Sequence, residues 1–288
     1  MMKRININGD FDVWQLGTSW APMYHAHMLA DMWRYANTTN ASHNIALSTD
    51  APTFAQAGRK ISQSAMITCT SAAACGSTQN LGLVYRGEGY EWAPCWQQQT
   101  TILFWVKSTK TRVFFTGLAN SAQDLSCPMA YTINTANTWE YKSVTLPASP
   151  ASTWYFDYRV GYSLYFFLAS GSMFWGTAGV WNSGQQAGDS SQVDFNDTNG
   201  ATFQLAGVQL EVGTSATSFG VWRFEDELRH CQRYIEKSFR PPGSVACRAS
   251  PGSSSPKPFI FHEVIHACFA GFDRGPSGLP RAAFDRLL

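Results

Sequence analysis

The sequence predicts an all-β protein, an antiparallel β-sandwich followed by one short helix and an irregular C-terminal arm. Short segments of alternating apolar and polar residues recur along the chain with turn-forming residues between them. No helical period lies between these segments, which favours a sandwich over an α/β fold. Residues 203–237 then combine one strand, one tight corner and one amphipathic helix. The chain therefore divides into a sandwich over 1–222, a docked helix over 223–239 and a linker with an arm over 240–288.

The expected strands follow one another at short intervals. They contain β-branched and aromatic residues, Gly or charged breaks separate the middle ones, and Pro147 and Pro150 close one of them. About nine or ten short strands with turns between them are typical of a sandwich. The segments are 5–16, 28–36, 60–69, 79–86, 100–107, 111–117, 138–146, 162–169 and 202–212.

A change of parity marks the last strand. Phe203 and Leu205 alternate on one parity, and Val208 and Leu210 alternate on the other. Gly207 lies between the two sets, where a β-bulge would re-aim the side chains. The sequence therefore predicts a bulge at Gly207.

An apolar seam predicts the helix that follows. Phe224, Leu228, Cys231 and Ile235 recur at steps of four, three and four residues. Acidic residues fill the first turn and basic residues the end, which suits the helix dipole. The Pro-Pro-Gly run at 241–243 then stops the helix.

Composition excludes some classes of function. The 288 residues carry a net charge of +1, so electrostatics give no reason to expect nucleic acid or an anionic membrane as partner. Charged residues make up only 14% and aromatic residues also 14%. This balance suits both an extracellular sugar-binding module and a subunit buried among others in an assembly.

Membrane insertion, secretion and disulfide bonding are not expected. No apolar run reaches the length of a membrane span, and the first ten residues lack the apolar region of a secretion signal. The seven cysteines are an odd number. Cys69 and Cys75 could pair across a turn if oxidised; in a reducing cytoplasm the cysteines would stay free thiols.

Several motifs occur in an order that resembles bacteriophage virion proteins of the tail-fibre, head-fibre or host-recognition type. They are a G-V-Q-L-E-V-G strand at 207–213, an A-T-x-F corner at 216–219, an E-L-x-x-C-Q-R-Y helix at 227–234, an N-G-D-F-D-V-W-Q opening at 8–15, an A-D-x-W strand at 30–33 and two middle strands at 101–107 and 137–142. The resemblance spans roughly residues 5–239. It implies that the sandwich is a jelly roll.

The resemblance also implies a role. The expected protein is a non-enzymatic fibre or adhesin, assembled in the host cytoplasm, carried on the virion and in contact with host-surface glycan. Its partners would be other virion proteins and further copies of itself, with a trimer favoured. No cofactor is expected. The alternatives are an architectural subunit without a ligand (head fibre, decoration or tail adaptor) and a surface-polysaccharide depolymerase.

Two aromatic loops, 87–98 and 170–200, are the expected glycan contacts. Sugar rings pack on Trp and Tyr, while amides and carboxylates bind the hydroxyls. The same rings could instead anchor the loops or fill a subunit interface. The strand residues Trp14, Trp33, Trp105 and Trp139 are expected in the core. The candidate glycan-binding residues are Tyr90, Trp92, Trp96, Trp175 and Trp181.

The sequence motifs for catalysis and metal binding are weaker than the aromatic pattern of the two loops. His262-Glu263-Val264-Ile265-His266 matches a zinc-hydrolase motif, but no third ligand follows at the required spacing, so no metal is expected. Paired acids for glycoside hydrolysis could come from Glu88 and Glu91 or from Asp189, Asp194 and Asp197, although solvated loop acids are the simpler interpretation. Residues 194–199 lack the ordered spacing of a calcium loop.

Overall fold

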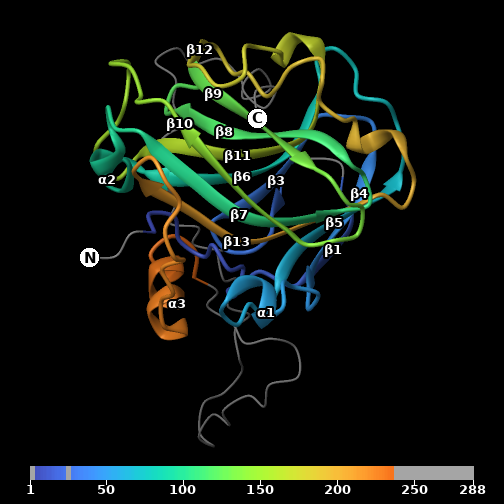
Figure 1. The fold of residues 1–288 in the computed structure, drawn as a ribbon, viewed down its shortest axis with the longest axis horizontal. Helices are drawn as coiled ribbons and strands as arrows, with labels where there is room; N and C mark the ends of the chain where they lie inside the picture. Colours follow the sequence, from blue (N-terminus) through green and yellow to red (C-terminus); the bar gives the residue numbers. More distant parts are fainter. Residues whose placement is uncertain (1–3, 24–26, 237–288) are drawn as a thin grey trace, which may run out of the picture.

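The computed structural model describes residues 4–23 and 27–236. The expected arm at 240–288, the end of the expected helix at 237–239 and the motif at 262–266 lie outside these residues. The described chain forms two antiparallel sheets that face each other as a sandwich (Figure 1). The predicted all-β fold is therefore confirmed.

The first sheet has six strands in the order β1-β4-β5-β13-β7-β10, all paired antiparallel. Its strands are β1 (Ser19–Met23), β4 (Ser42–Ser48), β5 (Ser64–Ser71), β13 (Thr202–Val212), β7 (Thr100–Ser108) and β10 (Glu140–Leu146).

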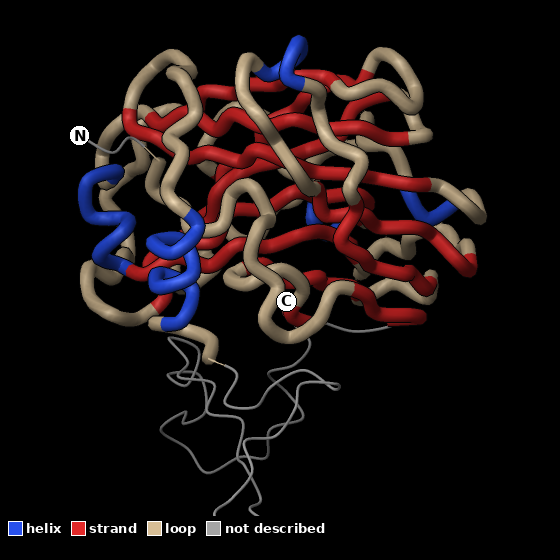
Figure 2. Tube along the Cα trace, turned by 90° about the horizontal axis from the view of Figure 1, so that it is seen from below, coloured by secondary structure: helices blue, strands red, loops and turns tan. Residues whose placement is uncertain are grey.

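The second sheet has seven strands in the order β12-β9-β8-β11-β6-β3-β2. These are β12 (Asn182–Ser183), β9 (Leu125–Ile133), β8 (Arg112–Asn120), β11 (Val160–Ser170), β6 (Asn80–Glu88), β3 (Trp33–Asn37) and β2 (His27–Met28). Figure 2 shows the strands of both sheets crossing the body, with the helices at its margins.

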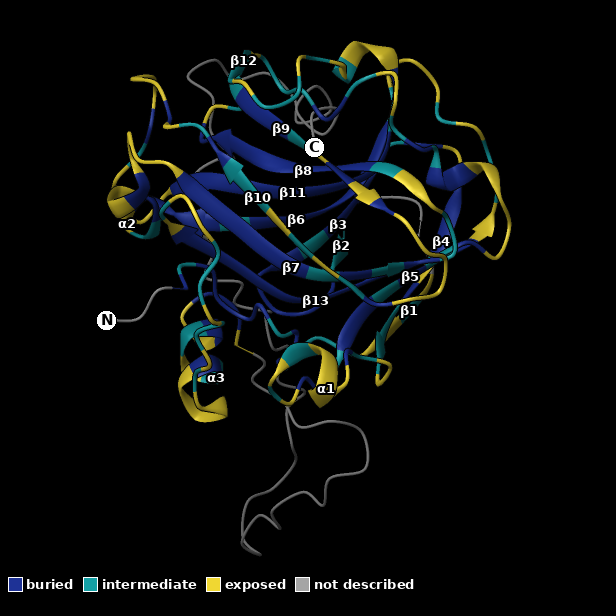
Figure 3. Cartoon of the chain, viewed as in Figure 1, coloured by how far each residue is buried: buried dark blue, intermediate teal, exposed yellow. Residues whose placement is uncertain are grey.

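Aromatic rings from the two sheets meet in the core. The Phe104 ring of β7 lies 4.9 Å from the Phe166 ring of β11, edge to face. The ring centroids of Phe203 of β13 and Phe114 of β8 are 5.6 Å apart. Figure 3 shows the central strands of both sheets as buried. This packing gives the sandwich a rigid body from which the loops project.

Short helices occupy the connections. The α-helices are α1 (Phe54–Ala57), α2 (Gly89–Trp92) and α3 (Phe224–Gln232), and the 3-10 turns are η1 (Ala93–Cys95), η2 (Ser172–Phe174) and η3 (Phe195–Asp197). None of the helices within the described ranges is long and apolar enough to cross a membrane.

The bulge at Gly207 is confirmed. Gly207 has a φ of 59°, and the register of β13 with β7 shifts between Ala206 and Gln209. A left-handed backbone at this point is accessible to glycine without a steric cost. The shift lets Leu205 and Val208 both face the core.

The prediction of a strand at 5–16 is wrong. Asn8 and Phe11 have positive φ, and the Asn8 side chain bonds both the N–H and the carbonyl of Val13. These contacts coil the segment while Ile7 stays buried. The sequence pattern also does not predict β4 or β9, because β4 opens with three polar residues and Pro128 lies within β9.

The buried face of α3 differs from the predicted seam. Cys231 is buried as expected, and so is Ile235 just beyond the end of α3 at Gln232, but Phe224 is exposed. Glu227 is buried instead, in an ion pair with Arg4. The helix is thus docked through a charge pair as well as through apolar contacts.

The cysteines of the described residues are free thiols, including Cys69 and Cys75. The oxidised pair considered from the sequence is therefore not formed. Burial raises the pKa of Cys75 to about 12, which keeps this thiol protonated at neutral pH.

Candidate functional site

Two segments far apart in sequence meet at one end of the sandwich. The Gly89 N–H donates to the Arg159 carbonyl (2.9 Å), and the Tyr90 N–H donates to the Asp157 carbonyl (3.2 Å). A Cβ on Gly89 would lie 2.3 Å from the Tyr155 carbonyl oxygen, so glycine permits the close approach. These contacts hold α2 against the segment that leads into β11.

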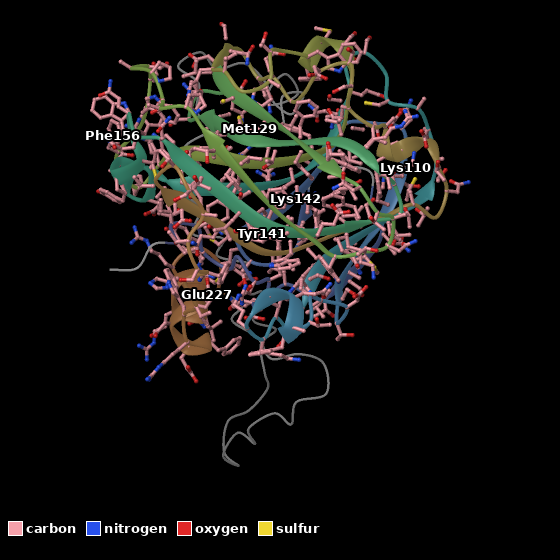
Figure 4. All side chains as sticks on the ribbon, in the orientation of Figure 1. Lys110, Met129, Tyr141, Lys142, Phe156 and Glu227 are labelled. Carbon is pink, nitrogen blue, oxygen red and sulfur yellow. The ribbon has the colours of Figure 1, made fainter. Side chains whose placement is uncertain are left out.

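Four aromatic side chains project from this end, and we call them the end cluster: Tyr90, Trp96, Phe156 and Tyr158. They are 58%, 39%, 41% and 66% exposed. The Trp96 and Phe156 rings lie edge to face with centroids 5.4 Å apart. Figure 4 places Phe156 beside α2 at one edge of the molecule. Grouped aromatic exposure on this scale is typical of an interaction site.

Polar groups surround the end cluster. Three consecutive exposed glutamines, 97–99, follow Trp96. Asp157 and Arg159 form an ion pair (2.8 Å). In the sequence Asp157 lies between Phe156 and Tyr158, and Arg159 follows Tyr158. The hydrogen bonds from Arg159 lower the pKa of Asp157, so this carboxylate is ionised near neutral pH. Rings flanked by amides and a fixed ion pair can bind a polyhydroxylated ligand.

Trp92 and Trp181, two of the predicted glycan contacts, are not part of the end cluster. Trp92 is fully buried and stacks on Trp154, with centroids 4.6 Å apart. Trp181 packs edge-on against Trp154 at 5.8 Å, and its indole N–H donates to the Pro147 carbonyl (3.1 Å). The three indoles anchor the loops beneath the end cluster, which was the alternative left open by the sequence.

Trp175 lies at the opposite end of β11. The strand runs from Val160, paired with Glu88, to Ser170, paired with Asn80. The Trp175 indole donates to the Ser170 carbonyl (3.0 Å). The structure therefore brings Tyr90 and Trp96 together with two residues outside the predicted set, Phe156 and Tyr158. Their signal was the W-Y-F-D-Y run at 154–158.

The carboxylates nearest the end cluster are held in structural contacts. Glu88 accepts two hydrogen bonds from Arg233 (2.7 and 2.9 Å). Glu91 accepts from the hydroxyls of Tyr85 and Tyr162 (3.0 and 3.3 Å). Burial raises the pKa of Glu91 to about 8, with a further contribution from Glu88. The two acids do not form an open pair across a binding cleft.

The acids of the second loop are likewise engaged. Asp194 accepts from the Asn196 and Cys75 backbone N–H groups, and Asp197 pairs with Lys110. Asp189 accepts from Ser191. Among the described residues, no group of three or more His, Cys, Asp or Glu side chains is placed to hold a metal ion.

A groove of about 510 Å³ lies on the outer face of the six-stranded sheet. Its floor includes Trp105, Tyr141 and Gly207, and its walls include Arg59, Ser218 and Phe219. Trp105 was expected in the core, but the alternation of β7 turns Phe104 inward and Trp105 outward. Figure 4 shows Tyr141 over the front sheet, away from Phe156.

No protein-family model matches the chain, and neither does any curated protein. Among solved structures, a putative sugar-binding protein of Bacteroides thetaiotaomicron is similar at 10% identity and a TM-score of 0.39, over 73% of this chain and 100% of that one. A family 11 carbohydrate-binding module of Clostridium thermocellum, in complex with a mixed-linked tetrasaccharide, is similar at 12% identity and a TM-score of 0.36, over 68% and 99%. Scores of this size do not by themselves indicate a shared function.

Proposed function

We propose that this protein is a non-enzymatic carbohydrate-binding β-sandwich whose end cluster contacts host-surface glycan. The exposed aromatic rings of Tyr90, Trp96, Phe156 and Tyr158, gathered by α2 and the 149–159 segment, carry this proposal. Aromatic faces pack against the C–H faces of sugars, and the neighbouring amides bind hydroxyls.

We also propose that this protein is part of a bacteriophage particle. Following the resemblance of residues 5–239 to bacteriophage virion proteins, the chain is a fibre or adhesin subunit that assembles in the host cytoplasm, as a trimer, with other virion proteins. Antibodies against the chain should label purified phage particles, and sedimentation should give three times the monomer mass. Free protein in lysates without particle label would contradict the virion assignment.

Glycan arrays of bacterial surface polysaccharides test the binding role. Wild-type protein should bind, and Tyr90→Ala and Trp96→Ala should each weaken binding about tenfold, equivalent to about 1.4 kcal/mol. Phe54→Ala is the matched control, because Phe54 is an exposed aromatic residue on α1, outside the end cluster. Equal binding by all four proteins would reject the end cluster as the contact.

The second candidate is an architectural subunit. The same exposed rings suit burial against another virion chain, since aromatic residues are enriched in protein interfaces. In that case Trp96→Ala would reduce incorporation into particles, and the wild-type protein would bind no glycan.

A further inference from the structure

We propose that the groove on the six-stranded sheet is a second saccharide-binding site, separate from the end cluster and selective for a neutral sugar chain. The floor of the groove is built by three neighbouring strands. Trp105 of β7 pairs across the sheet with Tyr141 of β10 on one side and Ala206 of β13 on the other.

Two aromatic rings form the platform. The Trp105 and Tyr141 rings have centroids 5.5 Å apart and planes inclined by 58°. Trp105 packs against the buried cluster of Ile61, Trp139 and Ala206, whereas Tyr141 is exposed. A fixed indole beside an exposed phenol ring offers successive surfaces to the rings of a sugar chain.

The bulge lets the platform and the wall of the groove approach the strand closely. At Gly207, an added Cβ would lie 3.3 Å from the Trp105 ring and 3.1 Å from the Arg59 guanidinium. Any side chain at this position would therefore occupy space beside the indole. Glycine therefore lets the Trp105 ring and the Arg59 guanidinium close against the bulge, which fixes the platform relative to the wall of the groove.

The walls of the groove are held in place before any ligand binds. Arg59 lies over the Phe219 ring at 3.8 Å and donates two hydrogen bonds to Asp10 (2.6 and 2.8 Å). The Thr217 N–H donates a hydrogen bond to the Glu211 carboxylate (2.7 Å). Because these segments are already ordered, binding incurs a smaller loss of conformational entropy.

Charge compensation indicates the class of ligand. Arg59 is the cationic wall residue of the groove among the described residues, and its bidentate partner Asp10 neutralises it. The polar groups that remain on the rim are neutral: the Ser218 hydroxyl, the Tyr141 hydroxyl and the Gln56 NH₂, whose amide oxygen is used in capping α1. Rings for stacking and neutral donors and acceptors suit a neutral saccharide.

Titration calorimetry with maltohexaose, cellohexaose, xylohexaose and mannohexaose tests this site on the whole chain. At least one neutral hexasaccharide should bind saturably. Tyr141→Ala should weaken that binding at least tenfold, and Tyr141→Phe, which keeps the ring, should retain most of it. Trp105 contributes to packing, so we avoid its truncation. Ser218→Trp, at an exposed rim position, should block the groove without removing any buried contact.

Two controls separate the sites. Phe54→Ala removes an exposed ring from α1. Gln56 of the same helix lines the groove, but Phe54 does not. Trp96→Ala alters the end cluster. Both should bind the hexasaccharide as wild type does, with thermal unfolding confirming that all variants are folded.

Three results would overturn the assignment: no binding of any neutral hexasaccharide, undiminished affinity in Tyr141→Ala and Ser218→Trp, or loss of the same binding in Trp96→Ala. Tighter binding of hexagalacturonate than of every neutral probe would reject the neutral class. Failure of the end cluster on glycan arrays leaves these outcomes unaffected, so the two proposals fail independently.

Discussion

Trp92 stacks on Trp154 with ring centroids 4.6 Å apart and ring planes 18° apart, so that a residue of α2 packs against the segment that precedes β11. Trp181 closes the stack from a third segment of the chain. Segments that carry the exposed rings of the end cluster are therefore joined to the body through buried indoles. The exposed aromatics owe their positions to tryptophans that are buried or half-buried beneath them.

Replacing Trp92 by Ala should destabilise the protein by about 3–5 kcal/mol, because it removes a fully buried ring and leaves a cavity beside Trp154. Urea unfolding measures this change. Tyr90→Ala, two residues away and exposed, should change stability by less than about 0.5 kcal/mol. Similar stabilities for the two variants would contradict the anchoring role of Trp92.

The Arg4–Glu227 pair should be needed for docking of α3. Both side chains are buried, and Glu227 also accepts from the Asn8 N–H. Removing one charge leaves the other buried and unpaired, so Arg4→Met should lower the free energy of unfolding by about 3–5 kcal/mol.

A double-mutant cycle with Glu227→Gln provides the control for this pair. The double variant should be less destabilised than the sum of the two single variants, because neither charge then remains alone. Strict additivity would show that the two side chains act independently.

Stability should fall as pH rises across the titration of Glu91. Its pKa is raised from 4.5 to about 8, mainly by burial. Between these values the native state holds a proton that the unfolded chain has released, so the free energy of unfolding decreases with pH by at most about 1.4 kcal/mol per unit. Glu91→Gln should flatten this slope and raise stability near pH 8. Urea unfolding at a series of pH values measures this slope. Equal slopes in the wild type and in Glu91→Gln would contradict the raised pKa of Glu91.

His43 should produce the opposite dependence at lower pH. Burial lowers its pKa from 6.5 to about 4, and the ring lies between the Tyr35 hydroxyl (2.7 Å) and the Asn196 amide oxygen (2.9 Å). Below pH 6.5 the His43 ring is protonated in the unfolded chain but stays neutral in the native state. The free energy of unfolding therefore decreases as pH falls towards 4.

His43→Phe isolates this effect. The variant should be less stable at pH 7, because Tyr35 and Asn196 lose a buried partner, but its stability should vary less between pH 6.5 and 4. An acid-side slope equal to that of the wild type would assign the loss to other groups.

The amino-acid sequence by itself determined the strands of the sandwich whose side chains alternate, the bulge at Gly207 and the presence of the helix that became α3. These features depend on near neighbours in the chain, and β13 occupies the predicted residues 202–212. The strands β4 and β9 and the coiled segment at 5–16 gave no such local signal. Their conformations follow from pairing and from contacts such as those between Asn8 and Val13.

Only the tertiary structure decided which aromatic residues face solvent. Trp92 and Trp96 lie four residues apart in one loop, yet the first is buried and the second exposed. The difference arises because Trp154, distant in sequence, stacks on Trp92, while Phe156 meets Trp96 at the surface. The groove likewise required three strands and two loops to converge on Trp105, because a ligand site is a property of the surface formed by packing, and residues from distant segments compose that surface.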